Sequence, residues 1–294
     1  DGTGLDSALA QWAKENAGIT WVAAAGNGAD DHWSGSFNDP DDDGWHNFSG
    51  EDEILGFYVP ANLGIDYGVS TYLKWDDWGT WNDYYGYSGT DQDYDLFLFI
   101  WDEDANQWVA VDSSQNQQPQ FTYPWESIEG WYAFHDAYWG IAIRKKQATK
   151  NVFFDLFITT HSRGSLEYNV PAGSLSSPAD SPYVIAVGAV DAVDDSYHFY
   201  SSQGPTADGR TKPDLCAPSA VSTSNTTYGL RSVTGGFAGT SASCPHVAGA
   251  FALLKGKTPF SLDEIKSILY RRAIDMGTSG MDNKYGRGRL NLRN

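Results

Sequence analysis

The chain has 294 residues, enough for one large domain or two ordinary ones, and a formal net charge of −19. Because no run of roughly 18 or more apolar residues occurs, we expect no membrane-spanning helix. The acidic balance argues against nucleic acid as a partner.

The charge and the tryptophans are unevenly spread. Between Asp30 and Glu167 there are 25 acidic and 6 basic residues, whereas the rest of the chain has 13 of each. Ten of the twelve tryptophans lie in the same acidic stretch. Two such compositions in one chain predict two domains, with residues 30–164 inserted between residues 1–29 and 165–294.

The chain begins with a predicted helix and strand. Residues 5–16 have helical periodicity, with Asp6 or Ser7 near the start and Gly18 at the end. The face expected to be buried holds Leu5, Leu9, Ala10 and Ala13. The continuous apolar run ITWVAAAGN follows and predicts a strand buried on both faces, as in a parallel sheet covered by helices.

The acidic stretch consists of short apolar or alternating runs separated by Gly, Asn, Asp and Pro, with no long helical period. This pattern predicts an antiparallel β-sandwich or jelly roll. We expect most of its aromatic residues to form the core. Exposed aromatic residues would suit binding of a polysaccharide or an extended polypeptide, and the sequence leaves both open.

An acidic loop, DPDDDG, places Asp39, Asp41 and Asp43 at every second position before Gly44. Carboxylates at this spacing on a curling loop can converge on one calcium ion. The twelfth position of the loop is Gly50 and not Glu, which argues against an EF-hand. The alternative to a structural calcium site is a solvated acidic turn.

From about residue 165 the first composition resumes. SPYVIAVGAV predicts another buried strand, and KPDLCAP a short extended segment. SLDEIKSILYRRAI predicts an amphipathic helix that begins with a capping box of Ser261 and Glu264. The preceding helix, residues 241–255, is apolar nearly all round and is therefore expected to be buried on every side.

Ser241 stands at the start of that apolar helix. A helix N-terminus presents free N–H groups and the positive end of the helix dipole. A serine there can attack a carbonyl carbon while its own backbone N–H binds the developing oxyanion. The simpler interpretation of the same residue is a helix cap.

The string GTSASCPHVAGA resembles the serine motif of the subtilisin-like serine proteases (subtilases). VAAAGN, SPADSPYVIAVGAV, YSSQGPTADGRTKPDLCAP and YGRGRLNL also resemble subtilase segments, in the family's order. The resemblance implies an α/β fold of three αβα layers with a mostly parallel sheet. It implies a serine endopeptidase acting on polypeptides, with Ser241 as nucleophile, Asn27 as oxyanion donor and His246 in a structural role.

The resemblance further implies a secreted protein. The segment YDLFLF resembles the pre-peptidase C-terminal type of β-sandwich that accompanies secreted proteases. In that setting we expect a disulfide between Cys216, in the strand leading toward the nucleophile's helix, and Cys244, three residues after Ser241. A pair of free, buried cysteines is the alternative.

The family's catalytic Asp and His motifs, Asp-Ser/Thr-Gly and His-Gly-Thr, do not occur in this sequence. We therefore expect the N-terminal half of the catalytic domain to be absent, to be supplied by the same precursor or by another chain, and the isolated chain to be nearly inactive. The competing hypothesis is a pseudoprotease or binding module that uses the acidic β-sandwich and has no catalytic activity.

Overall fold

The computed structural model describes residues 4–60, 68–82, 86–118, 122–132, 136–160, 166–222 and 236–293. The chain divides into two compact units, one made of Asp1–Ala29 with Pro171–Asn294 and the other of Asp30–Val170. We call them the α/β unit and the β unit. The second boundary lies after Val170, whereas composition alone placed the end of the inserted segment at residue 164.

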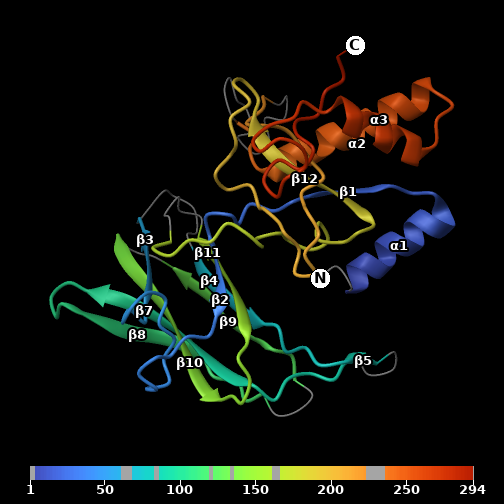
Figure 1. Cartoon of the computed structure of the whole chain (residues 1–294). Coiled ribbons are helices and arrows are strands. Elements are labelled where there is room, and N and C mark those ends of the chain that lie inside the picture. Colours follow the sequence, from blue (N-terminus) through green and yellow to red (C-terminus); the bar gives the residue numbers. More distant parts are fainter. Residues whose placement is uncertain are drawn as a thin grey trace. The chain divides into compact units, whose positions relative to one another are not determined.

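The α/β unit contains one parallel sheet and three helices within the described residues (Figure 1). The sheet has the strand order β1–β12–β13, with β1 at one edge. The bounds of these strands are Trp21–Ala24 for β1, Val184–Asp191 for β12 and Leu215–Ser219 for β13. The helices are α1 (Leu5–Ala17), α2 (Thr240–Lys257) and α3 (Leu262–Arg272).

Helices cover both faces of this sheet. Because side chains alternate along a strand, successive residues of β12 belong to different cores. Val184 and Ala186 pack with Ala10 of α1, whereas Ile185 and Val187 pack with residues of α2 and α3. The sheet therefore lies between α1 on one side and α2 with α3 on the other, which accounts for the continuous apolar sequence of β12.

The first helix forms, but of its predicted apolar face only Ala10 is fully buried, while Leu5 and Leu9 are exposed. Gly4 is the N-cap, without a side-chain hydrogen bond, and Gly18 ends the helix with a left-handed φ of 61°. Only Ser7 and Ala10 of the helix are buried, while Leu5 is 76% exposed. Trp12 is also exposed, at 59%. Periodicity located the helix, but the small contact with the sheet determines which of its residues are buried.

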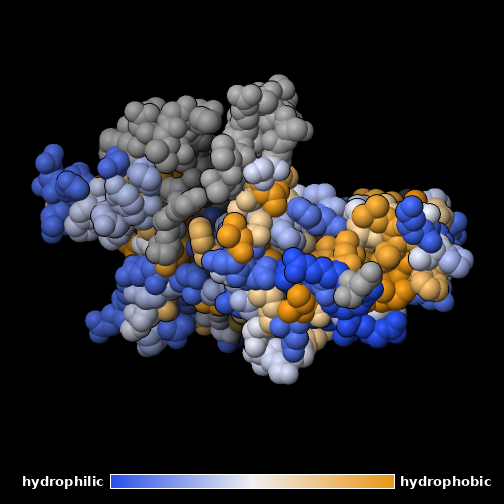
Figure 2. All heavy atoms as spheres, turned by 90° about the horizontal axis from the view of Figure 1, so that it is seen from above, coloured by the Kyte–Doolittle hydropathy of each residue, from blue (hydrophilic) through white to orange (hydrophobic). Residues whose placement is uncertain are grey.

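Helix α2 is buried on one side only, which corrects the expectation of burial all round. Val247, Ala250 and Phe251 pack against the sheet and α3, whereas Ala248 and Leu253 are exposed, Leu253 by 61%. Figure 2 shows hydrophobic residues gathered at the surface over the helices of this unit. Helix α2 thus has more apolar residues than the contacts of the described residues bury.

Helix α3 confirms its predicted start. Ser261 is the N-cap, its hydroxyl accepts from the backbone N–H of Glu264, and the Glu264 carboxylate accepts from the backbone N–H of Ser261. Ile265 and Leu269 are the residues that the helix buries.

In its described residues, the β unit contains two four-stranded antiparallel sheets and a short hairpin. One sheet has the order β3–β10–β7–β8, with bounds Leu55–Val59, Ala137–Gln147, Asp93–Asp102 and Gln107–Ser114. The other has the order β2–β11–β4–β9, with bounds His32–Ser36, Phe153–Thr160, Gly68–Trp75 and Trp125–Tyr132. The hairpin pairs β5 (Trp81–Asn82) with β6 (Gly86–Tyr87).

A single core joins the two sheets of the β unit. Leu98 of β7 and Ile141 of β10 come from one sheet, and Leu73 of β4 and Leu156 of β11 from the other, all buried in the same cluster. Trp75 is buried among them, so part of the high aromatic content serves packing.

Candidate functional site

The serine singled out by the sequence is the second residue of α2 and is exposed. The N-cap of the helix is Gly239, which makes no side-chain cap and has φ 103° and ψ 163°, a conformation that L-residues rarely adopt. Ser241 is therefore not the cap that its position in the sequence allowed. Because the first turn holds no acidic residue, the positive end of the helix dipole is not offset there by a carboxylate of the helix.

Asn27, which follows β1, lies against the start of the same helix. Its Oδ1 accepts hydrogen bonds from the backbone N–H of Thr240, at 2.8 Å, and from the Thr240 hydroxyl, at 2.9 Å. A backbone N–H can only donate, so the amide atom that meets it must be the oxygen. The Asn27 NH₂ group is thereby turned away from Thr240.

The freed amide group of Asn27 lies close to Gly239. A Cβ built on Gly239 would lie 3.1 Å from Asn27 Nδ2. The absence of a side chain at Gly239 thus lets the Asn27 NH₂ group approach the backbone two residues before Ser241. Two segments that are more than two hundred residues apart meet here, and Asn27 supplies hydrogen-bond donors at the helix N-terminus.

The turn that carries Asn27 is held by two serines. Gly26 has φ 113°, and a Cβ there would lie 2.7 Å from Ser202 Oγ and closer still to the hydroxyl of Ser176. Ser202 donates its backbone N–H to Gly26 O at 3.0 Å, and its hydroxyl accepts from the N–H of Gly28 at 3.1 Å. These contacts require glycine at residue 26 and fix the turn after β1.

Tyr200 and Ser219 hold the residue before the helix. The Gly239 N–H donates to the Tyr200 hydroxyl and to Ser219 Oγ, both at 3.0 Å, and the two hydroxyl oxygens lie 2.8 Å apart. The Ser219 hydroxyl also donates to Gly239 O at 3.1 Å. Sequence reasoning missed both residues, because nothing local marks a tyrosine and a serine that meet at one glycine.

His246 is exposed on α2, and its Nδ1 lies 2.8 Å from the carbonyl oxygen of Ala242, one turn earlier in the same helix. A ring nitrogen at this distance donates a hydrogen bond to the carbonyl, so Nδ1 is bonded within its own helix. This geometry gives His246 no hydrogen bond with Ser241, and its expected structural role remains a prediction.

The disulfide expected between Cys216 and Cys244 is wrong, since both cysteines are free thiols. On β13, Leu215 and Ala217 point toward α2 and α3, so Cys216 between them points to the opposite face of the sheet. Cys244 is on α2, and its Sγ lies 3.5 Å from Val22 O. The sheet separates the two sulfur atoms, a geometry that a disulfide cannot span. Burial raises the pKa of both thiols.

The three carboxylates of the acidic loop do come together. Ligand atoms of Asp39, Asp41 and Asp43 lie within 4.8 Å of one another. Burial and the charges of Asp43 and Asp41 raise the pKa of nearby Glu53. However, Lys145 Nζ already lies 3.0 Å from Asp39 Oδ2. Burial acts to raise the pKa of Asp39, but Lys145 and the backbone N–H groups of Asp43 and Gly44 together outweigh it and lower that pKa.

None of the described helices is long and apolar enough to cross a membrane.

Comparison with known proteins relates part of this chain to one family. Residues 160–288 match the family described as the subtilase family. The extracellular serine protease of Serratia marcescens is 43% identical over 60 residues, covering 20% of this chain and 6% of that protein. Serine protease AprX of Bacillus subtilis is 32% identical over 141 residues, covering 41% of this chain and 31% of that protein. The chain thus spans less than a third of the length of either relative.

A solved structure resembles the fold of almost the whole chain. The CspB protease of Clostridium perfringens aligns with a TM-score of 0.59 and 16% identity, covering 98% of this chain and 61% of that one. At this identity the likeness concerns the fold alone, and it extends over both compact units.

Proposed function

We propose that this chain, whose residues 160–288 match the subtilase family, carries the nucleophile and one oxyanion donor of a serine endopeptidase. The observation that carries the proposal is the orientation of Asn27. Thr240 holds its amide oxygen, and its NH₂ group lies beside Gly239 at the N-terminus of the helix that presents Ser241. A structural helix start needs no such donor.

In this reaction the Ser241 hydroxyl loses its proton to a general base and attacks the carbonyl carbon of a peptide bond. The C–N bond breaks, the amine leaves with that proton, and water then hydrolyses the acyl-enzyme. The Asn27 NH₂ group and the backbone N–H of Ser241 donate to the oxyanion of each tetrahedral intermediate. Thr240 acts through Asn27, since a rotated amide would present its oxygen to the developing negative charge. Loss of one oxyanion donor costs about 10²–10³ in turnover, a magnitude measured on a subtilisin.

The general base and the acid that orients it are proposed to come from a segment that is not in this sequence. Two surfaces of the α/β unit support this. Among the described strands, β1 is one of the two edges of the parallel sheet, with hydrogen-bonding groups directed outward. Helix α2 leaves apolar residues such as Leu253 exposed. A segment that added a strand to β1 and covered α2 would complete a three-layer domain around the nucleophile.

The test is labelling with a fluorophosphonate, which reacts with activated serines. We expect slow labelling of this chain and fast labelling of a longer form that includes the segment encoded upstream in its gene. Ser241→Ala should abolish labelling in both forms. Ser243→Ala, which removes a buried hydroxyl from the same helix, is the matched control and should leave labelling unchanged.

In the longer form, Asn27→Leu should lower kcat by about 10²–10³ while KM changes little, because the donor acts on the transition state. Absence of any labelling that depends on Ser241, in either form, would overturn the protease proposal. It would favour the alternative, a pseudoprotease or binding module, for which the strongly acidic β unit is the supporting feature.

Calcium binding by Asp39, Asp41 and Asp43 is a separate proposal. The convergence of the three carboxylates supports it, and Lys145 opposes it, because its ammonium group occupies one oxygen of Asp39. If calcium binds there, it should raise the melting temperature of the β unit, and Asp41→Asn should remove the increase. Equal melting with calcium and with chelator would identify the loop as a solvated acidic turn neutralised by lysine.

We further propose that the protein is secreted, on the basis of the Serratia marcescens relative that is named extracellular. The likeness of the β unit to the pre-peptidase C-terminal type of β-sandwich remains part of this proposal and rests on the segment YDLFLF alone.

A further inference from the structure

One outer face of the β unit carries a row of aromatic side chains. The residues pointing into the core from the sheet β3–β10–β7–β8 include Trp139 and Ile100, which are paired across β10 and β7. Their neighbours Tyr138 and Trp101 consequently point outward on adjacent strands. Strand pairing continues the row on both sides, since Tyr138 faces Tyr58 and Trp101 faces Trp108.

The rings of this aromatic row form two contacting pairs; Tyr58 and Tyr138 are exposed, and Trp101 and Trp108 are half-buried. The Tyr58 and Tyr138 ring centroids lie 5.2 Å apart, and those of Trp101 and Trp108 lie 5.3 Å apart. Tyr138 is 56% exposed. Cross-strand aromatic pairs stabilise a sheet, and the parts of these rings that remain exposed form an apolar surface that a ligand can contact.

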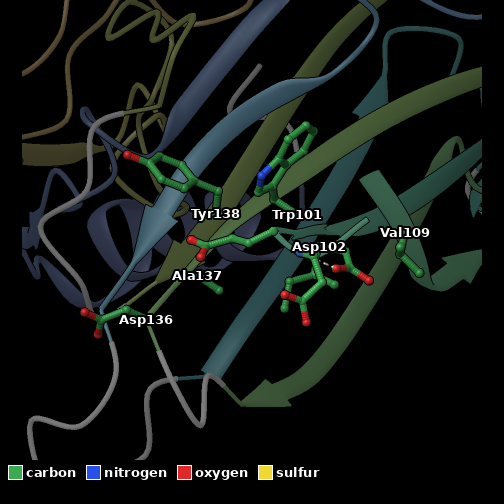
Figure 3. A pocket seen from close by; sticks show the side chains of 9 residues that line it. Trp101, Asp102, Val109, Asp136, Ala137 and Tyr138 are labelled. Carbon is green, nitrogen blue, oxygen red and sulfur yellow. Dashed lines mark hydrogen bonds between the residues drawn. The ribbon is translucent and has the colours of Figure 1, made fainter. Parts of the chain in front are cut away.

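A cavity of about 440 Å³ lies beside the two middle residues of the row, Trp101 and Tyr138 (Figure 3). Trp101 of β7 and Tyr138 of β10 form part of its lining. Its volume is in the range of pockets that hold a side chain or small ligand. The cavity is also lined by four carboxylates and by no basic residue: Asp102, Glu103, Asp104 and Asp136.

Two of these carboxylates are held in place by the fold. Asp102 Oδ1 accepts from the backbone N–H groups of Asp104 and Ala105, each at 3.0 Å. The Tyr58 hydroxyl hydrogen-bonds to Asp136, which raises the pKa of Tyr58. Four negative charges around one cavity favour a cationic ligand over a neutral or anionic one.

Cation–π contacts, of the kind that such a cation would make, already occur within the β unit. The guanidinium of Arg144 lies over the Trp45 ring at 5.2 Å from its centroid, and Lys145 Nζ lies over the Phe37 ring at the same distance. A guanidinium placed against an aromatic face with carboxylates around its edge combines stacking with charge-assisted hydrogen bonds.

We propose that this aromatic, carboxylate-lined cavity binds the arginine side chain of an extended polypeptide. Trp101 and Tyr138 stack on the guanidinium, and the carboxylates accept its N–H groups. A neutral sugar would also stack on the aromatic row, but it would leave the four carboxylates without a counter-charge. The inference does not depend on the protease proposal, because it concerns binding by the β unit alone.

The experiment is calorimetric titration of the full chain with a capped Gly-Arg-Gly peptide and with the same peptide carrying citrulline, which keeps the shape of arginine but not its charge. We expect the arginine peptide to bind about tenfold more tightly or better, with affinity that falls as salt rises.

Trp101→Leu should weaken arginine-peptide binding by roughly threefold to tenfold, and Tyr138→Ala should do likewise if Trp101→Leu does not fold. Glu103→Gln should also weaken binding. Glu51→Gln, which removes the same charge from an exposed site outside the cavity, is the matched control and should bind as the native chain does.

Equal binding of the arginine and citrulline peptides would overturn the proposal, as would equal losses for Glu103→Gln and Glu51→Gln, which would indicate a general effect of net charge. Binding of a neutral hexasaccharide in place of the arginine peptide would reassign the aromatic row to carbohydrate.

Discussion

The two compact units should unfold separately, and truncation of one buried leucine should show it. Leu98 is fully buried in the core of the β unit, and replacing such a leucine by alanine costs about 2–5 kcal/mol. For a unit of this size, Asp30–Val170, each kcal/mol lowers Tm by about 3 °C. Leu98→Ala should therefore lower the Tm of the β unit by roughly 10 °C.

The distribution of chromophores allows each unit to be followed alone. Ten of the twelve tryptophans are in the β unit, so tryptophan fluorescence reports its unfolding. The three helices of the described residues are all in the α/β unit, so helical circular dichroism reports that unit. Leu98→Ala should shift the fluorescence transition and leave the circular dichroism transition in place.

The matched variant is Leu269→Ala, which truncates a leucine that is 1% exposed in the core of the α/β unit. It should shift the circular dichroism transition only. If each variant moved both transitions by the same amount, the chain would be one cooperative unit and the reasoning from two cores would be refuted.

Three further predictions concern single side chains. Burial lowers the pKa of His46 to about 4 in the folded protein, below its usual value of 6.5. The unfolded chain is therefore protonated first, so the β unit should keep its full stability above pH 6.5 and lose roughly 3 kcal/mol of unfolding free energy as the pH falls to 4. His46→Gln should flatten this pH dependence in urea titrations of the β unit. Ser261→Ala removes the cap of α3 and should destabilise the α/β unit by about 1 kcal/mol in chemical denaturation, with no effect on the β unit. Denatured protein should titrate two thiols with or without reductant, because Cys216 and Cys244 are free; fewer thiols before reduction would contradict the structure.

Features of the fold that depend on neighbours in sequence were predictable. The capping box of α3 lies within four residues, and the buried strand β12 shows as an unbroken apolar run. The start of α2 was located by the same kind of local pattern. The burial of α2 could not be predicted in this way. The exposure of Leu253 depends on which segments pack against the helix, and no local sequence pattern contains that information.

The failed disulfide prediction shows which signal was overlooked. Proximity in the fold was inferred from the order of β13 and α2 along the chain, but the direction of a side chain on a strand alternates. The apolar residues Leu215 and Ala217 face α2 and α3, which places Cys216 on the opposite face of the sheet. The apolar pattern of β13 therefore contained the information that excludes the bridge to Cys244.

The start of α2 is built in a way that a purely structural helix would not require. The N-cap is Gly239, which is only about a few tenths of a kcal/mol less favourable there than Ser, Thr, Asp or Asn, and at its φ of 103° an alanine would be strained by about 1–3 kcal/mol. The hydroxyl of Thr240 is directed to Asn27, and Ser241 is left exposed. The side chains of Thr240 and Ser241 therefore do not cap the helix, and this arrangement supports the proposal that the helix start presents a serine beside an amide donor.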